Sequence, residues 1–180
     1  MDRLMVKLDG LTKQQKLENI TKALLSANNK ELANIIRNVI DNNDKDKVFI
    51  VNAAINLGLS PDYMLMNCYY LLDYAIMKND IPVIVTLIEK GANINRRKYS
   101  DCSHLHLCAQ DNNHVLMKYF IRKGLSVNEL DQKKNTPLFV ACCLINKECA
   151  KILIDNNADI EIRNESNLSL IHISEPTRPY

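Results

Sequence analysis

The chain has 180 residues, of which 47% are hydrophobic and 24% charged, a composition that supports one packed domain and excludes a wholly disordered chain. The formal net charge of +2 argues against a general nucleic-acid or membrane-surface binder. No apolar run reaches the roughly 18 residues that a bilayer requires, and residues 1–16 lack the apolar core of a secretory signal, so no membrane insertion is expected.

The N-terminal region predicts two amphipathic helices, at about residues 13–27 and 31–40. Each carries an apolar stripe at helical spacing: Leu17, Ile20, Leu24 and Leu25 in the first, and Leu32, Ile35, Ile36 and Val39 in the second. Residues 48–57 predict a further helix, whereas residues 38–46 are too rich in Asn and Asp to form its partner. We therefore expect residues 1–64 to form a helical N-terminal cap and a degenerate repeat.

Glycine spacing then indicates a repeat. Gly58, Gly91 and Gly124 stand 33 residues apart, and the next step of 33 reaches Asn157. Asn is the residue besides Gly that best tolerates a left-handed backbone. A left-handed residue at constant spacing predicts a recurring helix C-cap.

The segments around these caps are similar to one another. The stretches that contain each cap have an apolar helical stripe followed by a polar–apolar alternation: residues 83–95, 116–128 and 150–162. The stretches before them predict short helices with a shared leucine and a small residue: residues 70–80, 103–113 and 136–146. Thr136 is placed to cap the last of these and Pro137 to occupy its first turn. Such short helices are not stable alone and must stack on their neighbours.

These residues resemble the ankyrin-repeat family. Thr136–Ala141 matches the T-P-L-H-x-A signature with Phe139 in place of the His, and Ser103–His106 keeps the His but loses the Pro. Gly91–Asn95 is similar to the family's G-A-D-x-N ending. The resemblance implies an all-α ankyrin-repeat solenoid of helix-turn-helix units with projecting hairpins.

On this register the chain divides into repeats. The expected units are residues 65–97, 98–130 and 131–163, with the start of a further repeat at residues 164–167. The helix around Ile152, Leu153 and Ile154 would then lack its neighbour, and its apolar face should be exposed. We expect a monomer unless that C-terminal face self-associates.

The last segment has another resemblance. Residues 168–180 resemble the direct translation of a sequencing-library adapter, although Ser169–His172 also echoes the repeat signature. We therefore expect a non-native tail that should be excluded from fold reasoning, and a chain that is the N-terminal fragment of a longer protein.

The cysteines indicate a reducing compartment. Without an export signal, six thiols are expected to be reduced and mostly buried, in the cytoplasm or nucleus, including those of a host cell. They are Cys68, Cys102, Cys108, Cys142, Cys143 and Cys149. A disulfide between the adjacent Cys142 and Cys143 would be strained and is not expected in a reducing compartment. Cys142 is expected in the core and Cys143 partly exposed.

One cluster invites a metal interpretation: Cys102, His104, His106 and Cys108. In a helix, however, side chains two residues apart diverge by about 200°, so these groups are not expected to meet at one ion. The resemblance instead implies that His106 supports the backbone of a hairpin. No phosphate loop, carboxylate pair or activated nucleophile is visible, so we expect no cofactor and no enzymatic activity.

The resemblance implies that the chain binds a partner through its hairpin tips and the exposed face of the first helix of each repeat. Its position-by-position transfer gives these residues: Met66, Asn67, Tyr69, Met77, Lys78, Arg97, Tyr99, Ser100, Gln110, Asp111, Leu130, Gln132, Lys133, Asn135 and Leu144. Arg96, Arg97, Lys98 and Tyr99 also form a basic tip, which is either a contact for an acidic patch or an ordinary solvated loop. The expected function is non-catalytic binding of an unidentified protein. The alternatives are the targeting domain of a larger enzyme or channel, and a pathogen or viral adaptor that recruits host factors through a further module.

Overall fold

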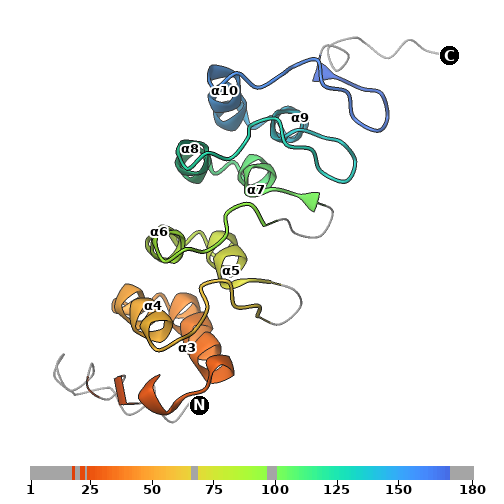
Figure 1. Cartoon of the computed structure of the whole chain (residues 1–180). Coiled ribbons are helices and arrows are strands. Elements are labelled where there is room, and N and C mark those ends of the chain that lie inside the picture. Colours follow the sequence, from red (N-terminus) through yellow and green to blue (C-terminus); the bar gives the residue numbers. More distant parts are fainter. Residues whose placement is uncertain (1–17, 19–20, 23, 66–68, 97–100, 171–180) are drawn as a thin grey trace. The chain divides into compact units, whose positions relative to one another are not determined.

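The computed structural model describes residues 18, 21–22, 24–65, 69–96 and 101–170 (Figure 1). The chain forms two compact units, residues 1–92 and 93–180, each considered by itself below. None of the helices in the described ranges is both long and apolar enough to traverse a bilayer.

The first unit contains two helix pairs. Its described helices are α3 (Asn29–Asp41), α4 (Lys47–Asn56), α5 (Leu71–Met77) and α6 (Ile81–Glu89). Helix α3 packs on α4 and α5 on α6, while α3 also contacts α5 and α4 contacts α6 (Figure 1). The unit therefore has two layers of stacked helices, which is the arrangement of a solenoid.

Helix α3 confirms the predicted helix at residues 31–40 and extends it slightly at both ends. Asn28 and Glu31 form a capping box in which each backbone N–H donates to the other side chain at 3.0 Å. The fully buried Ile36 lies on its apolar stripe. Residues 38–41 complete α3 and residues 42–46 connect it to α4, so residues 38–46 form no separate helix, and the partner of α4 is α3 itself. The expected helix at residues 13–27 lies largely outside the described residues.

The second unit repeats the same plan. Its described helices are α7 (His104–Gln110), α8 (His114–Arg122), α9 (Pro137–Cys143) and α10 (Lys147–Asp155). Helix α7 packs on both α8 and α9, and α10 packs on both α8 and α9 (Figure 1). Within the described residues the one bridge of β type, between Met64 and Tyr70 of the first unit, is isolated. The predicted all-α solenoid fold is thus confirmed.

The left-handed positions follow the predicted period. Gly58, Gly91 and Gly124 have φ angles of +103°, +92° and +95°, and Asn157 has +62°. Asn157 therefore replaces glycine directly after the C-cap residue Asn156 of α10, as the period predicted.

Two further sets of residues with positive φ recur at the same spacing. The turns between paired helices use Asn79, Asn112 and Ile145, and the hairpins use Asp101, Lys134 and Asn167. Asn167 thus stands at the turn position that the register assigns to it.

The first helix of each repeat has a side-chain hydrogen bond at its N-terminus, and the accepting group differs from repeat to repeat. The backbone N–H of Tyr70 donates to Asp73 Oδ2 at 3.2 Å. In the next repeat, the N–H of Ser103 donates to His106 Nδ1 at 3.2 Å. In the last, Thr136 Oγ1 accepts from the N–H of Phe139 at 3.1 Å, which confirms Thr136 as the cap.

The hairpin loops are closed by one side chain each. Asp131 Oδ1 accepts from the N–H groups of Lys133 and Asn135 at 2.9 and 2.8 Å. In the following loop Asn164 Oδ1 accepts from the N–H groups of Ser166 and Leu168, both at 3.0 Å. The loop at residues 164–168 therefore has the geometry of the loop at residues 131–135.

The expected exposure of the α10 apolar face is wrong for two of its three residues. Ile152 and Leu153 are buried because α10 packs against both α8 and α9. Ile154 alone of these three is exposed.

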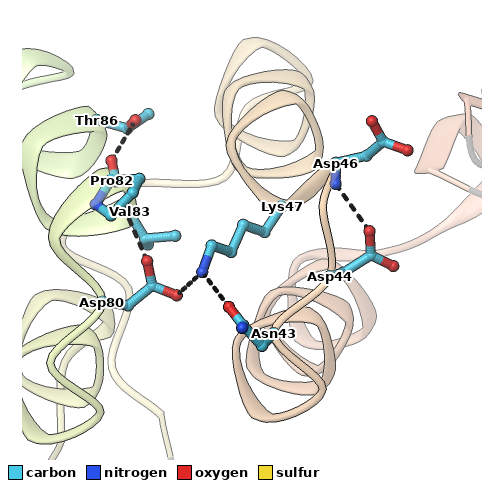
Figure 2. Close-up of polar contacts among 8 residues, drawn as sticks. All are labelled: Asn43, Asp44, Asp46, Lys47, Asp80, Pro82, Val83 and Thr86. Atoms are coloured by element: carbon cyan, nitrogen blue, oxygen red, sulfur yellow. Dashed lines mark hydrogen bonds and ion pairs between the residues drawn. The ribbon is translucent and has the colours of Figure 1, made fainter.

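A buried ion pair joins the two helix pairs of the first unit. Lys47 Nζ lies 2.7 Å from Asp80 Oδ2, and the two side chains are 14% and 5% exposed. Figure 2 shows Lys47 at the start of α4 reaching both Asp80 and Asn43, whose Oδ1 accepts from Nζ at 2.7 Å. Asp80 Oδ1 also caps α6 by accepting from the N–H of Val83 at 3.4 Å. One carboxylate thus caps a helix and neutralises a lysine from the preceding pair.

Candidate partner-binding surface

The predicted binding residues are divided between the two units, and some lie outside the described residues. The latter are Met66, Asn67, Arg97, Lys98, Tyr99 and Ser100. Arg96 is described and half-buried. The basic tip therefore stays a prediction.

In the first unit, Lys78 takes part in a polar network. Lys78 Nζ lies 2.7 Å from Asp41 Oδ1 and 5.5 Å from the ring centre of Tyr74. The hydroxyl of Tyr74 donates to the same Asp41 oxygen at 2.6 Å. The hydrogen bond from Lys78 lowers the pKa of Asp41, and the same bond raises the pKa of Lys78. The charge of Lys78 is therefore compensated within the unit, whereas its neighbour Met77 is 51% exposed and Tyr69 is half-buried.

In the second unit, the ends of α7 and α9 lie together. Gln110 and Asp111 are exposed at the end of α7, and Leu144, directly after α9, is 50% exposed. Asn146 Nδ2 donates to the carbonyl oxygens of Ala109 and Gln110 at 2.7 and 3.3 Å. This amide fixes the turn after α9 against the end of α7, so three predicted residues share one surface.

The described hairpin of this unit carries four predicted residues with two different roles. Leu130 is 37% exposed, and Gln132 and Lys133 are exposed. Asn135 is half-buried, and its Nδ2 donates to Asp131 Oδ2 at 3.0 Å. Its carbonyl oxygen accepts from His106 Nε2 at 2.9 Å. Asn135 thus holds the hairpin, whereas the side chains of the other three residues are exposed.

The two buried histidines bind backbone rather than metal. His106 accepts the Ser103 N–H at Nδ1, so the proton is on Nε2, which donates to Asn135. This is the hairpin support that the resemblance implies. His104 Nδ1 lies 2.7 Å from the carbonyl oxygen of Ile94, and its ring stacks on Phe120 at 5.2 Å. The two rings are thus directed to different loops, and no group of three or more metal-binding side chains occurs in the described part of the chain.

The described cysteines are free thiols. Cys108 and Cys149 are buried, Cys143 is exposed, and Cys142 is half-buried rather than in the core. Burial raises the pKa of Cys149 to about 11 and raises the pKa of Cys108 still further from its usual range. A catalytic thiol needs its pKa lowered, so these environments do not activate a nucleophile.

Sequence reasoning missed Ile145. This residue is 75% exposed and lies beside Leu144 in the turn between α9 and α10. The repeat register contains the signal, because Asn79 and Asn112 occupy the same position in the preceding turns. An isoleucine in place of asparagine puts an apolar side chain on the surface.

A small hollow lies between α8 and α10. It has a volume of about 250 Å³ and is lined by Lys118, Ile121, Arg122, Ile152, Asp155 and Asn156. None of these is a residue predicted to bind a partner, so the hollow lies apart from the predicted surface.

The comparison with known families agrees with this geometry. Residues 72–164 match the family described as ankyrin repeats (3 copies). The chain belongs to the ankyrin-repeat family. Ankyrin repeats are generally protein–protein interaction modules, and the family is typically non-catalytic.

Proteins similar to the chain come from viruses and animals. The chain is 39% identical over 119 residues to the putative ankyrin repeat protein R96 of Acanthamoeba polyphaga mimivirus, a match that covers 66% of this chain and 12% of the relative. It is 27% identical over 154 residues to the putative ankyrin repeat protein FPV034 of fowlpox virus, covering 82% of this chain and 34% of the relative. It is 32% identical over 88 residues to the human transient receptor potential cation channel subfamily A member 1, covering 48% of this chain and 8% of the channel. The chain thus spans about a third or less of each of these proteins.

Proposed function

We propose that the chain is a non-catalytic protein–protein interaction module that binds its partner through the hairpin tips and the exposed face of the first helices. The observation that carries this proposal is the exposure of Leu144 and Leu130, at 50% and 37%, on the surface that the register assigns to binding. Exposed aliphatic side chains that recur on one surface favour a contact with another protein.

The proposed partner is a protein rather than a nucleic acid, since the formal net charge of +2 shows no overall excess of basic residues, which a general nucleic-acid binder typically has. We propose that the module acts as a monomer in the cytoplasm or nucleus, including those of a host cell. The free thiols at Cys108, Cys142, Cys143 and Cys149 support a reducing compartment.

A second candidate is a module within a longer protein, which it directs to a target. The lengths of the relatives favour this candidate, because the matched regions are small parts of the mimivirus protein and of the channel. On this view the repeats select the partner and another part of the protein is the enzyme, the channel or the recruitment module. The two viral relatives support an adaptor that engages host factors.

Affinity capture with the full chain and matched charge variants tests the main proposal. One bait carries Leu130→Asp and Lys133→Glu in the described hairpin, and a second carries Arg96→Glu, Arg97→Glu and Lys98→Glu. The control, Lys151→Glu, reverses an exposed charge on α10 outside the proposed surface. Quantitative mass spectrometry should show proteins that the wild type and the control retain and that at least one hairpin variant loses by fivefold or more. Retention of the same proteins by all four baits would refute binding through the hairpins.

A further inference from the structure

Helix α7 contains two buried histidines. His104 and His106 are each 2% exposed, although the helix has only 7 residues. The same register positions hold Leu71 and Asp73 in the preceding repeat, and Pro137 and Phe139 in the following one. The two imidazoles are therefore a feature of this repeat and not of the repeat pattern.

Both ring nitrogens of His106 hold the ring in its neutral form. Nδ1 accepts the N–H of Ser103 at 3.2 Å, and Nε2 donates to the carbonyl oxygen of Asn135 at 2.9 Å. A second proton on the ring would occupy the Nδ1 lone pair. The Ser103 hydroxyl, whose Oγ lies 2.8 Å from Nδ1, is able to accept from the charged ring, but the Ser103 N–H then loses its acceptor.

The charged groups around α7 lie mainly at the surface. Helix α9 carries no charged residue, and those of α8, α10 and the adjoining loops that the structure describes as exposed are His114, Lys118, Arg122, Lys147, Glu148, Lys151, Asp155, Asp101, Asp111, Lys123, Lys133 and Lys134. Arg96, Glu129 and Asp131 are half-buried in the loops. Carboxylates take up protons near about pH 4, and thiols, phenols and ammonium groups lose theirs above about pH 8. Among these groups, only the imidazoles therefore change charge between pH 7.5 and 5.5.

A charged ring at His106 is hydrated only if it leaves its buried position, because burial disfavours the charged form. That movement breaks the bond to Asn135 and removes the side chain that accepts at the start of α7. The hairpin that is released carries Leu130 and Lys133 of the proposed binding surface.

We propose that His106 makes α7 and the hairpin at residues 130–135 a pH-sensitive element, which is closed at neutral pH and opens in mild acid. A hydrated imidazole takes its second proton near about pH 6.5. The open form binds this proton and the closed form does not. The closed form therefore has its full stability above about pH 6.5 and loses stability as the pH falls below that value. The opening itself is independent of the proposed function, and only its effect on binding rests on that function.

Amide hydrogen exchange of the full chain at pH 7.5 and 5.5 tests the opening, once each rate is divided by the intrinsic rate at that pH. The protection of the amides of α7 and of Asn135 should fall about tenfold at the lower pH. Helix α6 is the internal control, because residues 1–92 of the first unit contain no histidine. Its amides should keep their protection within twofold.

His106→Gln is the matched variant, because a glutamine three residues after Ser103 completes a capping box and does not titrate. Its protection in α7 should change by less than twofold between the two pH values. His104→Gln should still lose at least fivefold. A pH dependence that persists in His106→Gln, or that disappears in His104→Gln, would overturn the assignment to His106.

Nitrogen-15 NMR of the wild-type imidazoles tests the same point without a substitution. In the closed chain the His106 ring should keep a protonated Nε2 and an unprotonated Nδ1 at both pH values. A His106 ring that gains its second proton near about pH 6.5, with protection of α7 unchanged, would refute the proposal.

Affinity capture at the two pH values connects the opening with binding. Proteins that the wild type retains through the hairpin at pH 7.5 should be lost at least fivefold at pH 5.5 and kept by His106→Gln. Equal retention at both pH values despite lost protection would refute the effect on binding. Absence of hairpin-dependent capture at pH 7.5 would instead refute the proposed function, while the exchange experiment would still decide the opening.

Discussion

At the scale of single residues, the repeat register identifies where this chain departs from its own pattern. Asn157 follows the pattern, because it takes the left-handed conformation of Gly58, Gly91 and Gly124. Ile145 breaks it, because it adopts the backbone of Asn79 and Asn112 with a β-branched side chain. The energetic consequence of such a break is measurable in a single substitution.

Ile145→Asn should stabilise the protein by about 1 kcal/mol, since asparagine relieves the left-handed strain and removes an exposed apolar side chain. Urea denaturation monitored by circular dichroism measures the change. The reciprocal variant, Asn112→Ile, introduces the strain at the same register position and should destabilise by about the same amount. A loss of stability in Ile145→Asn would show that the isoleucine is held by packing instead.

The thiol of Cys149 makes stability depend on pH. Its pKa is raised to about 11 in the folded chain by burial, from an ordinary value of 9.0. Below pH 9 the thiol is neutral in both states, so stability is unaffected. Between pH 9 and 11 only the unfolded chain loses this proton, and the folded state loses stability.

Cys149→Val removes this titration and keeps an apolar side chain at the position that Val83 occupies in an earlier repeat. At pH 10 the wild type should have lost on the order of 1 kcal/mol more than the variant, relative to pH 8. Denaturation midpoints at the two pH values provide the measurement. Equal losses in both proteins would mean that Cys149 ionises as easily in the folded chain as in the unfolded one.

At the scale of the elements, periodicity predicted the helices and their caps, and three-dimensional contacts decided the rest. The spacing of Thr136 and Pro137 predicted the start of α9, and the composition of residues 38–46 indicated that they do not form a separate partner helix for α4. The pairing of α3 with α4 was not visible, because the segment between them lacks the repeat signature. The burial of Ile152 and Leu153 was missed because it depends on how α10 lies against α8 and α9.

The same limit applied to the predicted surface. The register correctly marked Leu144 and Leu130 as exposed, but it also included Asn135, which the structure shows closing its own hairpin. Position in a repeat predicts which way a side chain is directed. It does not predict whether that side chain is already engaged by its neighbours.

The Lys47–Asp80 pair joins α4 to α6 and gives a prediction at this scale. Asp80→Asn retains a capping side chain, as Asn113 shows in the next repeat, but leaves the Lys47 ammonium without its carboxylate. We expect a loss of about 2 kcal/mol, because this lysine is largely buried. Thermal and urea denaturation of the variant give the value.

A double-mutant cycle separates the pair from the cap. Lys47→Met removes the charge, and the double variant Lys47→Met/Asp80→Asn should recover most of the stability lost in Asp80→Asn, since no unpaired charge is then buried. Strictly additive losses would mean that the two side chains are not coupled. Thr86, whose hydroxyl bonds within α6 to the carbonyl of Pro82, provides a neutral control as Thr86→Ser (Figure 2).

At the scale of the whole molecule, the repeat, one period in length, is the recurring unit of structure. Caps, turns and hairpins recur in three left-handed series that share one spacing, and within each unit the two helix pairs contact each other. In such a chain stability is approximately a sum of repeats and their interfaces. Removing one full period should therefore shorten the stack without changing its local geometry.

Deletion of residues 104–136 tests this, because it joins Ser103 to Pro137 and restores a cap followed by a first-turn proline. We expect a chain that keeps its helical circular dichroism per residue and still unfolds cooperatively, at a lower midpoint because one interface is lost. Deletion of residues 104–131 is the control, since it removes a similar length but brings Gln132 to the position of the helix start. The off-period variant should lose most of its helical signal, because its apolar faces no longer align with those of the neighbouring repeats. If both deletions melted alike, stability would depend on composition alone, and the period would not be the folding unit of this protein.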